Sequence, residues 1–340
     1  MQPSLYLDHA ATTPILPAAR AALLEGLDRW ANPSSVHGPG RAARAALEDA
    51  RVRIAAALDW PGEVILTGGA SEALAIAIQR CTRPLAAVSP VEHDSVLRLA
   101  GDAPRLPVDG NGLVTGAALA GLVAIQHVNN ETGVIQPLAR LAAEVHAAGG
   151  WLLADCAQSA GKLALPPADL IAISAHKFGG PVGVGALLVR DWAMLQPTGG
   201  QEQGYRPGTE NLPGALAMAA ALEAGRDWLT GAERLRRTLE TGIVASGGTV
   251  VAADAPRVAS VGALAMPGKA AAVQLIRFDG MGIAVSAGSA CSSGSLKPSH
   301  VLAAMGLPNA GEVIRVSIGR ETRETDIARF LAAWQEVRGA

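Results

Sequence analysis

The sequence predicts an α/β fold with a mostly parallel sheet that is covered by helices on both faces. Short apolar runs alternate with helical stretches over the first two thirds of the chain, which is typical of such sheets. Hydrophobic residues make up 49% of the 340 residues and aromatic residues only 3%. Small aliphatic side chains must therefore fill the core, as in helices packed closely on a parallel sheet. The length suggests two domains or one large α/β unit.

The expected strands of the sheet are short apolar runs bounded by glycine or polar residues. They lie at residues 64–67, 85–89, 123–128, 151–154, 170–174 and 184–189. Helical patterns at 16–30, 41–58, 138–148 and 213–229 would cover this sheet. A smaller region follows, with strands near 250 and at 258–264, 283–286 and 313–318, a helix at 270–278 and a last helix around 327–337.

Charge and cysteine content exclude several classes of protein. The formal net charge is -2 and charged residues make up 17%, so no basic field would attract nucleic acid or an anionic membrane. No apolar run reaches the ~18 residues of a membrane span, and the start lacks a signal-peptide pattern. We expect a cytoplasmic protein that binds neither DNA nor a membrane.

The three cysteines, Cys81, Cys156 and Cys291, show neither a close pair nor metal-ligand spacing, so we expect no disulfide and no metal site.

Lys177 is the first candidate for chemistry, because it follows the apolar run 170–173 in the segment SAHKFGG. Ligands of open α/β sheets bind at the carboxyl ends of the strands. A lysine shielded there can act as an amine nucleophile toward an aldehyde, although a solvated surface lysine is the alternative. Asp155 ends the strand at 151–154, where it either faces a cation or caps the next helix. An imine-forming lysine and an aspartate facing a ring nitrogen are the groups expected around pyridoxal phosphate.

Other strand ends carry further candidates. Gly69, Ala70 and Ser71 join a strand to a helix, so they could form a phosphate cradle, or Ser71 could simply cap the helix. His93 follows another strand, where its ring could stack on a flat cofactor or be a structural histidine. Arg315 lies between β-branched residues and should pair with a carboxylate, either internal or that of a substrate.

Cys291 differs from the other two cysteines in its neighbours. It lies in SAGSACSSGS, residues 286–295, which contains only small residues. We therefore expect a partly exposed thiol, which in a cytoplasmic protein is a liability unless it reacts usefully. Cys81 and Cys156 have apolar neighbours and are expected to be buried and inert.

These segments, in this order, resemble the cysteine desulfurases, the NifS and IscS group of the class V aminotransferases. The resemblance covers almost the whole chain and rests on YLDHAATTP, GGASE, VEH, HVNNETGV, DCAQ, SAHK, GGQEQGYRPGTEN, SAGSACSSGS and IRVSIGR. It implies the fold type I of pyridoxal-phosphate enzymes. A large domain, residues 15–229, would contain a mainly parallel seven-stranded sheet. Residues 1–14 and 230–340 would form a smaller α+β domain that carries the cysteine loop.

The resemblance also implies individual roles. Lys177 would be the Schiff-base lysine, Asp155 would face the pyridine nitrogen, His93 would stack on the ring and Gln158 would bind the ring hydroxyl. The phosphate would be bound by Ser71 with its neighbours Gly69 and Ala70, by Ser174 and His176, and by Thr209 from the partner subunit of a homodimer. Asn130 and Arg315 would bind the substrate carboxylate.

The implied activity is the removal of sulfur from L-cysteine. Cys291 would attack the substrate sulfur, leaving L-alanine and a persulfide that passes to a sulfur-acceptor protein for iron–sulfur cluster assembly or another thiolation. Two alternatives remain: a selenocysteine lyase or aminotransferase of the same fold that does not use Cys291, and a non-catalytic partner-binding protein. His9 stands where relatives often carry Tyr or Asn, and Cys156 where alanine is common.

Overall fold

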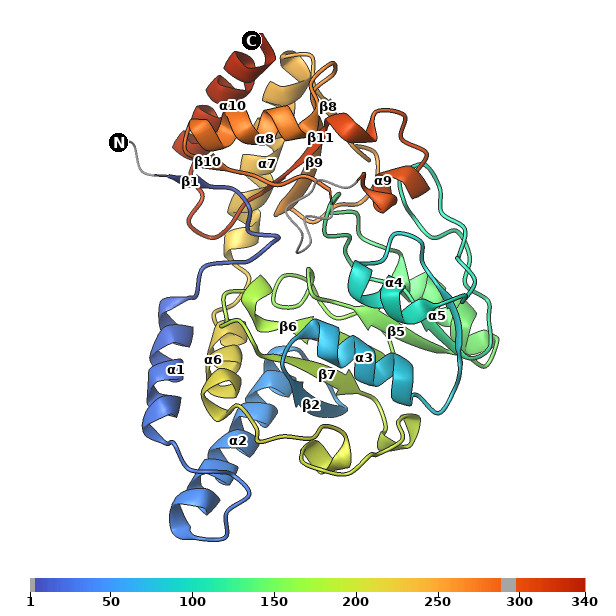
Figure 1. The fold of residues 1–340 in the computed structure, drawn as a ribbon, viewed down its shortest axis with the longest axis vertical. Helices are drawn as coiled ribbons and strands as arrows, with labels where there is room; N and C mark the ends of the chain where they lie inside the picture. The colour runs from blue at the N-terminus through green and yellow to red at the C-terminus, as the bar shows by residue number, and fades with distance from the viewer. Residues whose placement is uncertain (1–3, 289–297, 340) are drawn as a thin grey trace.

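A six-stranded sheet forms the centre of the larger part of the molecule (Figure 1). The computed structural model describes residues 4–288 and 298–339. The strands of this sheet are β2 (Glu63–Thr67), β3 (Leu85–Val88), β4 (Leu122–Ala124), β5 (Trp151–Asp155), β6 (Leu170–Ser174) and β7 (Gly185–Val189). Their order is β2-β7-β6-β5-β4-β3. The strands β3 to β6 are parallel, and β7 runs antiparallel to both of its neighbours.

Helices cover both faces of the sheet, as expected from the sequence. One face carries α1 (Pro17–Asp28), α2 (Gly38–Ala57), α5 (Leu138–Ala147) and α6 (Leu212–Glu223), and the other carries α3 (Ala70–Arg80) and α4 (Asp94–Ala100). Alternate residues of β6 point to opposite faces, so Ile171 and Ile173 join one core while Leu170 and Ala172 join the other. This burial on both sides explains why the strand has no polar residue before Ser174, and the α/β class with a mostly parallel sheet is confirmed.

The sheet has six strands among the described residues, one fewer than the resemblance implies. Beside β3, the chain forms only an isolated parallel bridge between Val88 and Arg105. Two prolines, Pro104 and Pro107, flank this bridge. Proline has no N–H to donate to a neighbouring strand, so the pairing does not extend into a regular seventh strand.

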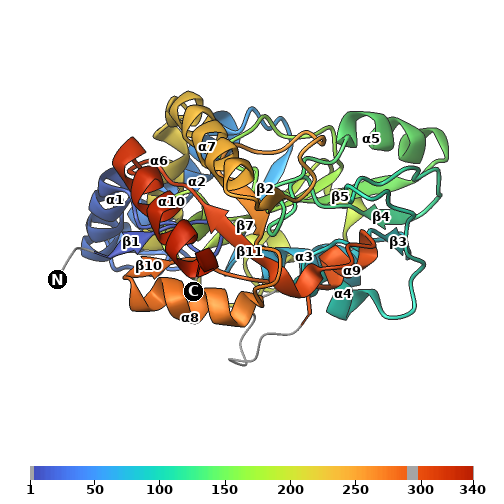
Figure 2. The ribbon, with the colours of Figure 1, turned by 90° about the horizontal axis from the view of Figure 1, so that it is seen from above.

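A smaller part is built around a second sheet and lies above the larger part in Figure 1, while Figure 2 looks down onto it. Its strands β8 (Thr249–Val250), β9 (Val261–Ala265) and β11 (Val313–Ser317) are antiparallel, in the order β11-β9-β8. The first strand, β1 (Leu5–Tyr6), pairs with β10 (Ile283–Ala284), so the beginning of the chain lies within this part. The helices α7 (Trp228–Ala245), α8 (Ala271–Gly280), α9 (His300–Ala304) and α10 (Glu324–Gly339) complete it. This arrangement supports, as a proposal, the two domains 15–229 and 1–14 with 230–340.

One expected helix is divided in two. The sequence pattern suggests a continuous helix at 213–229, but α6 ends at Glu223 and α7 begins at Trp228. Gly225 lies between them with a φ of +76°, a conformation that breaks a helix and suits glycine. Within the described residues, no helix is long and apolar enough to cross a membrane.

A buried ion pair anchors the loop that leads from β7 to α6. Glu202 accepts hydrogen bonds from Arg51 Nη1 at 2.7 Å and Nη2 at 3.1 Å, and from the backbone N–H of Leu66 at 2.7 Å. The Glu202 side chain is 1% exposed and that of Arg51 14%. Glu202 and Gln203 both have positive φ values, 50° and 59°, so the ion pair holds the loop in a conformation that these residues rarely adopt.

We expect Arg51→Met to lower the free energy of unfolding by about 3 kcal/mol, because it leaves the Glu202 carboxylate buried without its cation. The control is Arg29→Met, which removes an exposed pair with Glu25 and should cost less than about 1 kcal/mol. Denaturant unfolding of both variants measures the difference. Equal losses would show that the buried pair does not anchor the loop.

Candidate active site

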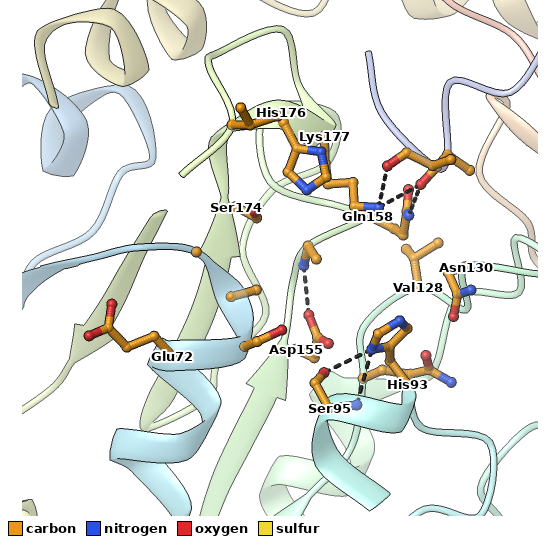
Figure 3. Close-up of a pocket in the computed structure, with 18 of the residues that line it drawn as sticks. Glu72, His93, Ser95, Val128, Asn130, Asp155, Gln158, Ser174, His176 and Lys177 are labelled. Carbon is orange, nitrogen blue, oxygen red and sulfur yellow. Dashed lines mark hydrogen bonds between the residues drawn. The ribbon is translucent and has the colours of Figure 1, made fainter. Parts of the chain in front are cut away.

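A cavity of about 690 Å³ opens at the carboxyl ends of the parallel strands. It lies between this edge of the sheet and residues of the smaller part, including Ser286 and Arg315. Most of the residues that the sequence singles out meet here: Gly69, Ala70, Ser71, His93, Asn130, Asp155, Gln158, Ser174, His176, Lys177 and Arg315. Figure 3 shows several of them converging on one space.

Lys177 reaches into this cavity from the short 3-10 turn η1 (Ala175–Lys177) that follows β6. Its Nζ donates to the carbonyl oxygens of Ala10 and Ala11, each at 2.8 Å (Figure 3). These carbonyls belong to the N-terminal segment, so a stretch far away in the sequence holds the amine. The alternative of a solvated surface lysine is thereby wrong.

Asp155 ends β5 with its side chain buried and facing the cavity. One carboxylate oxygen accepts the backbone N–H of Ala157 at 2.9 Å. Burial raises the pKa of Asp155, while the hydrogen bond from the backbone N–H of Ala157 and the nearby charge of Lys177 oppose that rise. A cation that entered the cavity beside this carboxylate would favour its ionised form.

His93 is a structural histidine that also faces the cavity. Its Nδ1 accepts the backbone N–H of Ser95 at 3.2 Å and lies 2.8 Å from the Ser95 hydroxyl, so the residue caps α4. Its ring also lines the cavity. Burial lowers the pKa of His93, and an Nδ1 that accepts an N–H carries no proton. The ring is therefore neutral, with its proton on Nε2.

The start of α3 forms one end of the cavity. Gly69 is the N-cap, with a φ of +147° and no side-chain cap, and Ser71 lies inside the first turn. Ser71 is thus not the helix cap that the sequence allowed. The unpaired first-turn N–H groups and the positive end of the helix dipole suit an anion. The nearby hydroxyl of Ser174 would lie 3.6 Å from a Cβ placed on Gly69.

His176 is held beside the same end of the cavity. Its Nδ1 lies 3.1 Å from Thr12 Oγ1. Burial, and then the charge of Lys177, lower the pKa of His176 to about 4. The ring is therefore neutral near pH 7 and can donate only one N–H.

Gln158 links the cavity to the N-terminal segment. Its Nε2 donates to the carbonyl oxygen of Ala10 at 2.8 Å. Its Oε1 is buried and accepts no hydrogen bond within the part of the chain that the structure describes. A buried acceptor without a donor costs free energy, so this oxygen is suited to a hydroxyl group of a bound molecule.

Arg315 has an internal carboxylate partner. Its Nη2 lies 2.8 Å from Asp8 Oδ1, and its Nη1 donates to the backbone oxygen of Asn130 at 3.1 Å. The sequence left open whether the partner is internal or belongs to a substrate, and among the described residues that partner is Asp8. Both Asp8 and Arg315 line the cavity, so a substrate carboxylate could still reach the guanidinium group.

Two expected site residues are not among those that line the cavity. Thr209 lies exposed on the loop before α6, and Cys291 falls outside the described residues. The other lining residues, to which the sequence assigned no role, include Asp8, Glu72 and Ser286. Each lies in a segment that carries the family resemblance, and this was the only sequence signal for them.

Comparisons with known proteins agree with this geometry. The model of the family described as aminotransferase class V matches residues 5–330. A cysteine desulfurase of Rhodobacter capsulatus is 37% identical over 374 aligned positions, which cover 99% of this chain and 97% of that protein. The chain belongs to the cysteine desulfurase family.

Solved structures of the family extend this result to the fold. A NifS-like protein from Rickettsia africae superposes with a TM-score of 0.90 at 27% identity, covering 99% of this chain and all of that one. The structure of SspA in complex with cysteine superposes with a TM-score of 0.78 at 29% identity, covering 93% of this chain and 99% of that one. The type I fold of pyridoxal-phosphate enzymes is therefore confirmed.

Neutral histidines around the site should make stability depend on pH. His127 is buried, its backbone N–H donates to the backbone carbonyl of Asp155 at 2.9 Å, and burial lowers the pKa of its ring to about 4. Its folded pKa is below the unfolded value, so its contribution is present above about pH 6.5 and is lost as the pH falls toward 4.

We expect wild type to lose stability relative to His127→Gln when the pH falls from about 7.5 to about 5. Glutamine replaces the imidazole ring with an amide group, which is also polar but takes up no proton in this pH range. Denaturant unfolding at several pH values measures the difference between the two proteins. A difference that stays constant with pH would contradict a buried neutral His127.

Proposed function

We propose that the protein is a cysteine desulfurase that binds pyridoxal phosphate in this cavity. It removes sulfur from L-cysteine, leaving L-alanine, and carries the sulfur as a persulfide on Cys291 to an acceptor protein. The observation that carries the proposal is the presence of Lys177 and Asp155 in one cavity, in a chain that shares 37% identity with a cysteine desulfurase. The cysteine bound in the related SspA structure supports cysteine as the substrate.

The residues in the cavity fit this cofactor. The buried Oε1 of Gln158 needs a donor, which the ring hydroxyl would supply. The buried carboxylate of Asp155 needs a cation, which a protonated ring nitrogen would supply. The start of α3 offers unpaired N–H groups for a phosphate. Three groups of different chemistry thus match three parts of one molecule.

These matches assign the contacts. Lys177 would bind the aldehyde carbon, His93 would lie against the ring, and Gly69, Ala70, Ser71, Ser174 and His176 would surround the phosphate. Bound in this way, pyridoxal phosphate supplies an electron sink for bond cleavage at an amino acid. Asp155 keeps that sink effective, because its carboxylate favours a protonated ring nitrogen.

Other residues of the chain bind and orient the substrate. Arg315 and Asn130 would hold the cysteine carboxylate, and Asp8 keeps the guanidinium group in place. Lys177, once released from the Ala10 and Ala11 carbonyls, can move protons at the reacting carbon. The neutral rings of His93 and His176 add no charge that would compete with Asp155 or with the phosphate.

The sulfur step needs a thiolate. In the proposed reaction the C–S bond of cysteine breaks and an S–S bond forms on Cys291. The electron pair stays with the carbon, which takes up a proton to give L-alanine. Burial raises the pKa of Cys81 and of Cys156, so neither is suited to act as a thiolate.

A homodimer is part of the proposal. The loop with Thr209 is tied to the start of α3, because Arg206 Nε lies 3.1 Å from Glu72 Oε1. Thr209 itself is exposed, so it is available to a second copy of the chain. It would reach the phosphate in the partner's cavity rather than in its own.

We expect Cys291→Ala to keep the yellow colour of the bound cofactor while alanine formation from cysteine falls by roughly 10²-fold or more, as when a nucleophile is removed. Cys81→Ala is the matched control and should retain activity. Absorbance and amino-acid analysis of the same samples give both readouts. Full turnover in Cys291→Ala would contradict the role of Cys291 and favour a selenocysteine lyase or aminotransferase.

A further inference from the structure

A second lysine, Lys162, lies buried next to the site. Lys162 and Lys177 both line a small cavity of about 20 Å³, which is distinct from the main cavity. The other lining residues are Thr13, Gly161, Phe178, Trp228, Gly319 and Arg320. A cavity of this size holds about one water molecule, so a single water can connect groups on its wall.

The two amines differ in their partners. Lys177 Nζ donates to two carbonyl oxygens. Lys162 is only 6% exposed, yet the structure shows no hydrogen bond from its Nζ to any described residue. A buried ammonium group without acceptors is costly, so Lys162 is better suited to the neutral form. Burial, and then the charge of Lys177, lower the pKa of Lys162 to about 7.

The surroundings of Lys162 also disfavour a positive charge. Lys177 from η1 and Arg320 from the segment after β11 line the same cavity, and no carboxylate among the described residues does. His9 approaches from the N-terminal segment and packs its ring on Gly319, where a side-chain Cβ would clash with the ring. Burial lowers the pKa of His9 to about 4, so its ring is neutral near pH 7 and offers Lys162 no negative partner.

The composition of the chain gives independent support. Lysine and arginine total 28 residues, but only four are lysines: Lys162, Lys177, Lys269 and Lys297. The chain thus uses arginine for nearly all of its positive charges. Arginine cannot lose its proton in a protein, whereas a buried lysine can. Two of the four lysines lie on the wall of one small cavity. This placement supports a role for amines that can exchange protons there.

We propose that Lys162 is a positioning residue that accepts the proton which Lys177 must lose before its amine can bond to an aldehyde. One proton moves from the Lys177 ammonium group to the neutral Lys162 amine, directly or through one water, and the total charge of the site does not change. The aldehyde in question is that of the cofactor, so this role rests on the proposed function. The coupling of the two amines can be tested without the cofactor.

The first test is a titration of the cofactor-free protein labelled with carbon-13 lysine. Four lysines give four side-chain Cε signals, which single variants assign. We expect Lys162 to titrate near pH 7 and the Lys177 signal to show a step at the same pH. In Lys162→Met that step should vanish, whereas Lys269→Met should leave it unchanged. An ordinary titration of Lys162 near pH 10.4, or an unchanged Lys177 curve in Lys162→Met, would overturn the proposal.

The second test follows the binding of pyridoxal phosphate to the cofactor-free protein by absorbance. At pH 7 we expect Lys162→Met to bind it roughly 10²-fold more slowly, the lower end of general acid–base effects. Its melting temperature should not fall, since methionine replaces an unpaired buried amine with an apolar group. A lower melting temperature of Lys162→Met with an unchanged rate of pyridoxal phosphate binding would show that Lys162 has only a structural role. If the wild-type protein itself binds no pyridoxal phosphate, the proposed function is wrong. The titration still tests whether the protonation of Lys162 and Lys177 is coupled.

Discussion

The parallel pairing of β5 with β6 is the interaction on which the site depends. Asp155 lies opposite Ala172 in this register, so both strands end at the same edge of the sheet. The chain can then place Asp155 at the end of one strand and Lys177 in the turn after the other. A shift of one residue would turn Asp155 toward the core and bring Ala154 to the cavity. The apolar burial of both faces of β5 and β6 opposes such a shift.

The N-terminal segment connects this edge to the smaller part of the molecule. The β1–β10 pairing fixes its beginning, and the Ala10 carbonyl accepts hydrogen bonds from both Gln158 and Lys177. Asp8 in the same segment pairs with Arg315. The expected cofactor lysine and the expected substrate arginine are thus both held by residues 8–11. These carbonyls must release Lys177 when it binds an aldehyde, which gives the segment a part in cofactor binding.

Much of this arrangement could be predicted from local sequence. Apolar runs that end in a polar residue located β5 and β6, and the carboxyl-edge rule brought Asp155 and Lys177 together. Contacts between distant segments could not be predicted in this way. No local pattern in the sequence selects Asp8 as the partner of Arg315, and Lys162 follows Gln158 in an ordinary turn. The break at Gly225 was missed because the apolar pattern continues across it.

The central claim is that Lys177 is the amine that binds pyridoxal phosphate. Borohydride reduction of the protein loaded with the cofactor fixes the pyridoxyl group on its lysine, and peptide mass spectrometry then locates it. With four lysines in the chain, each candidate is distinguishable. The account predicts that the added mass is found on Lys177 alone. Added mass on Lys162, or on neither lysine, would contradict it.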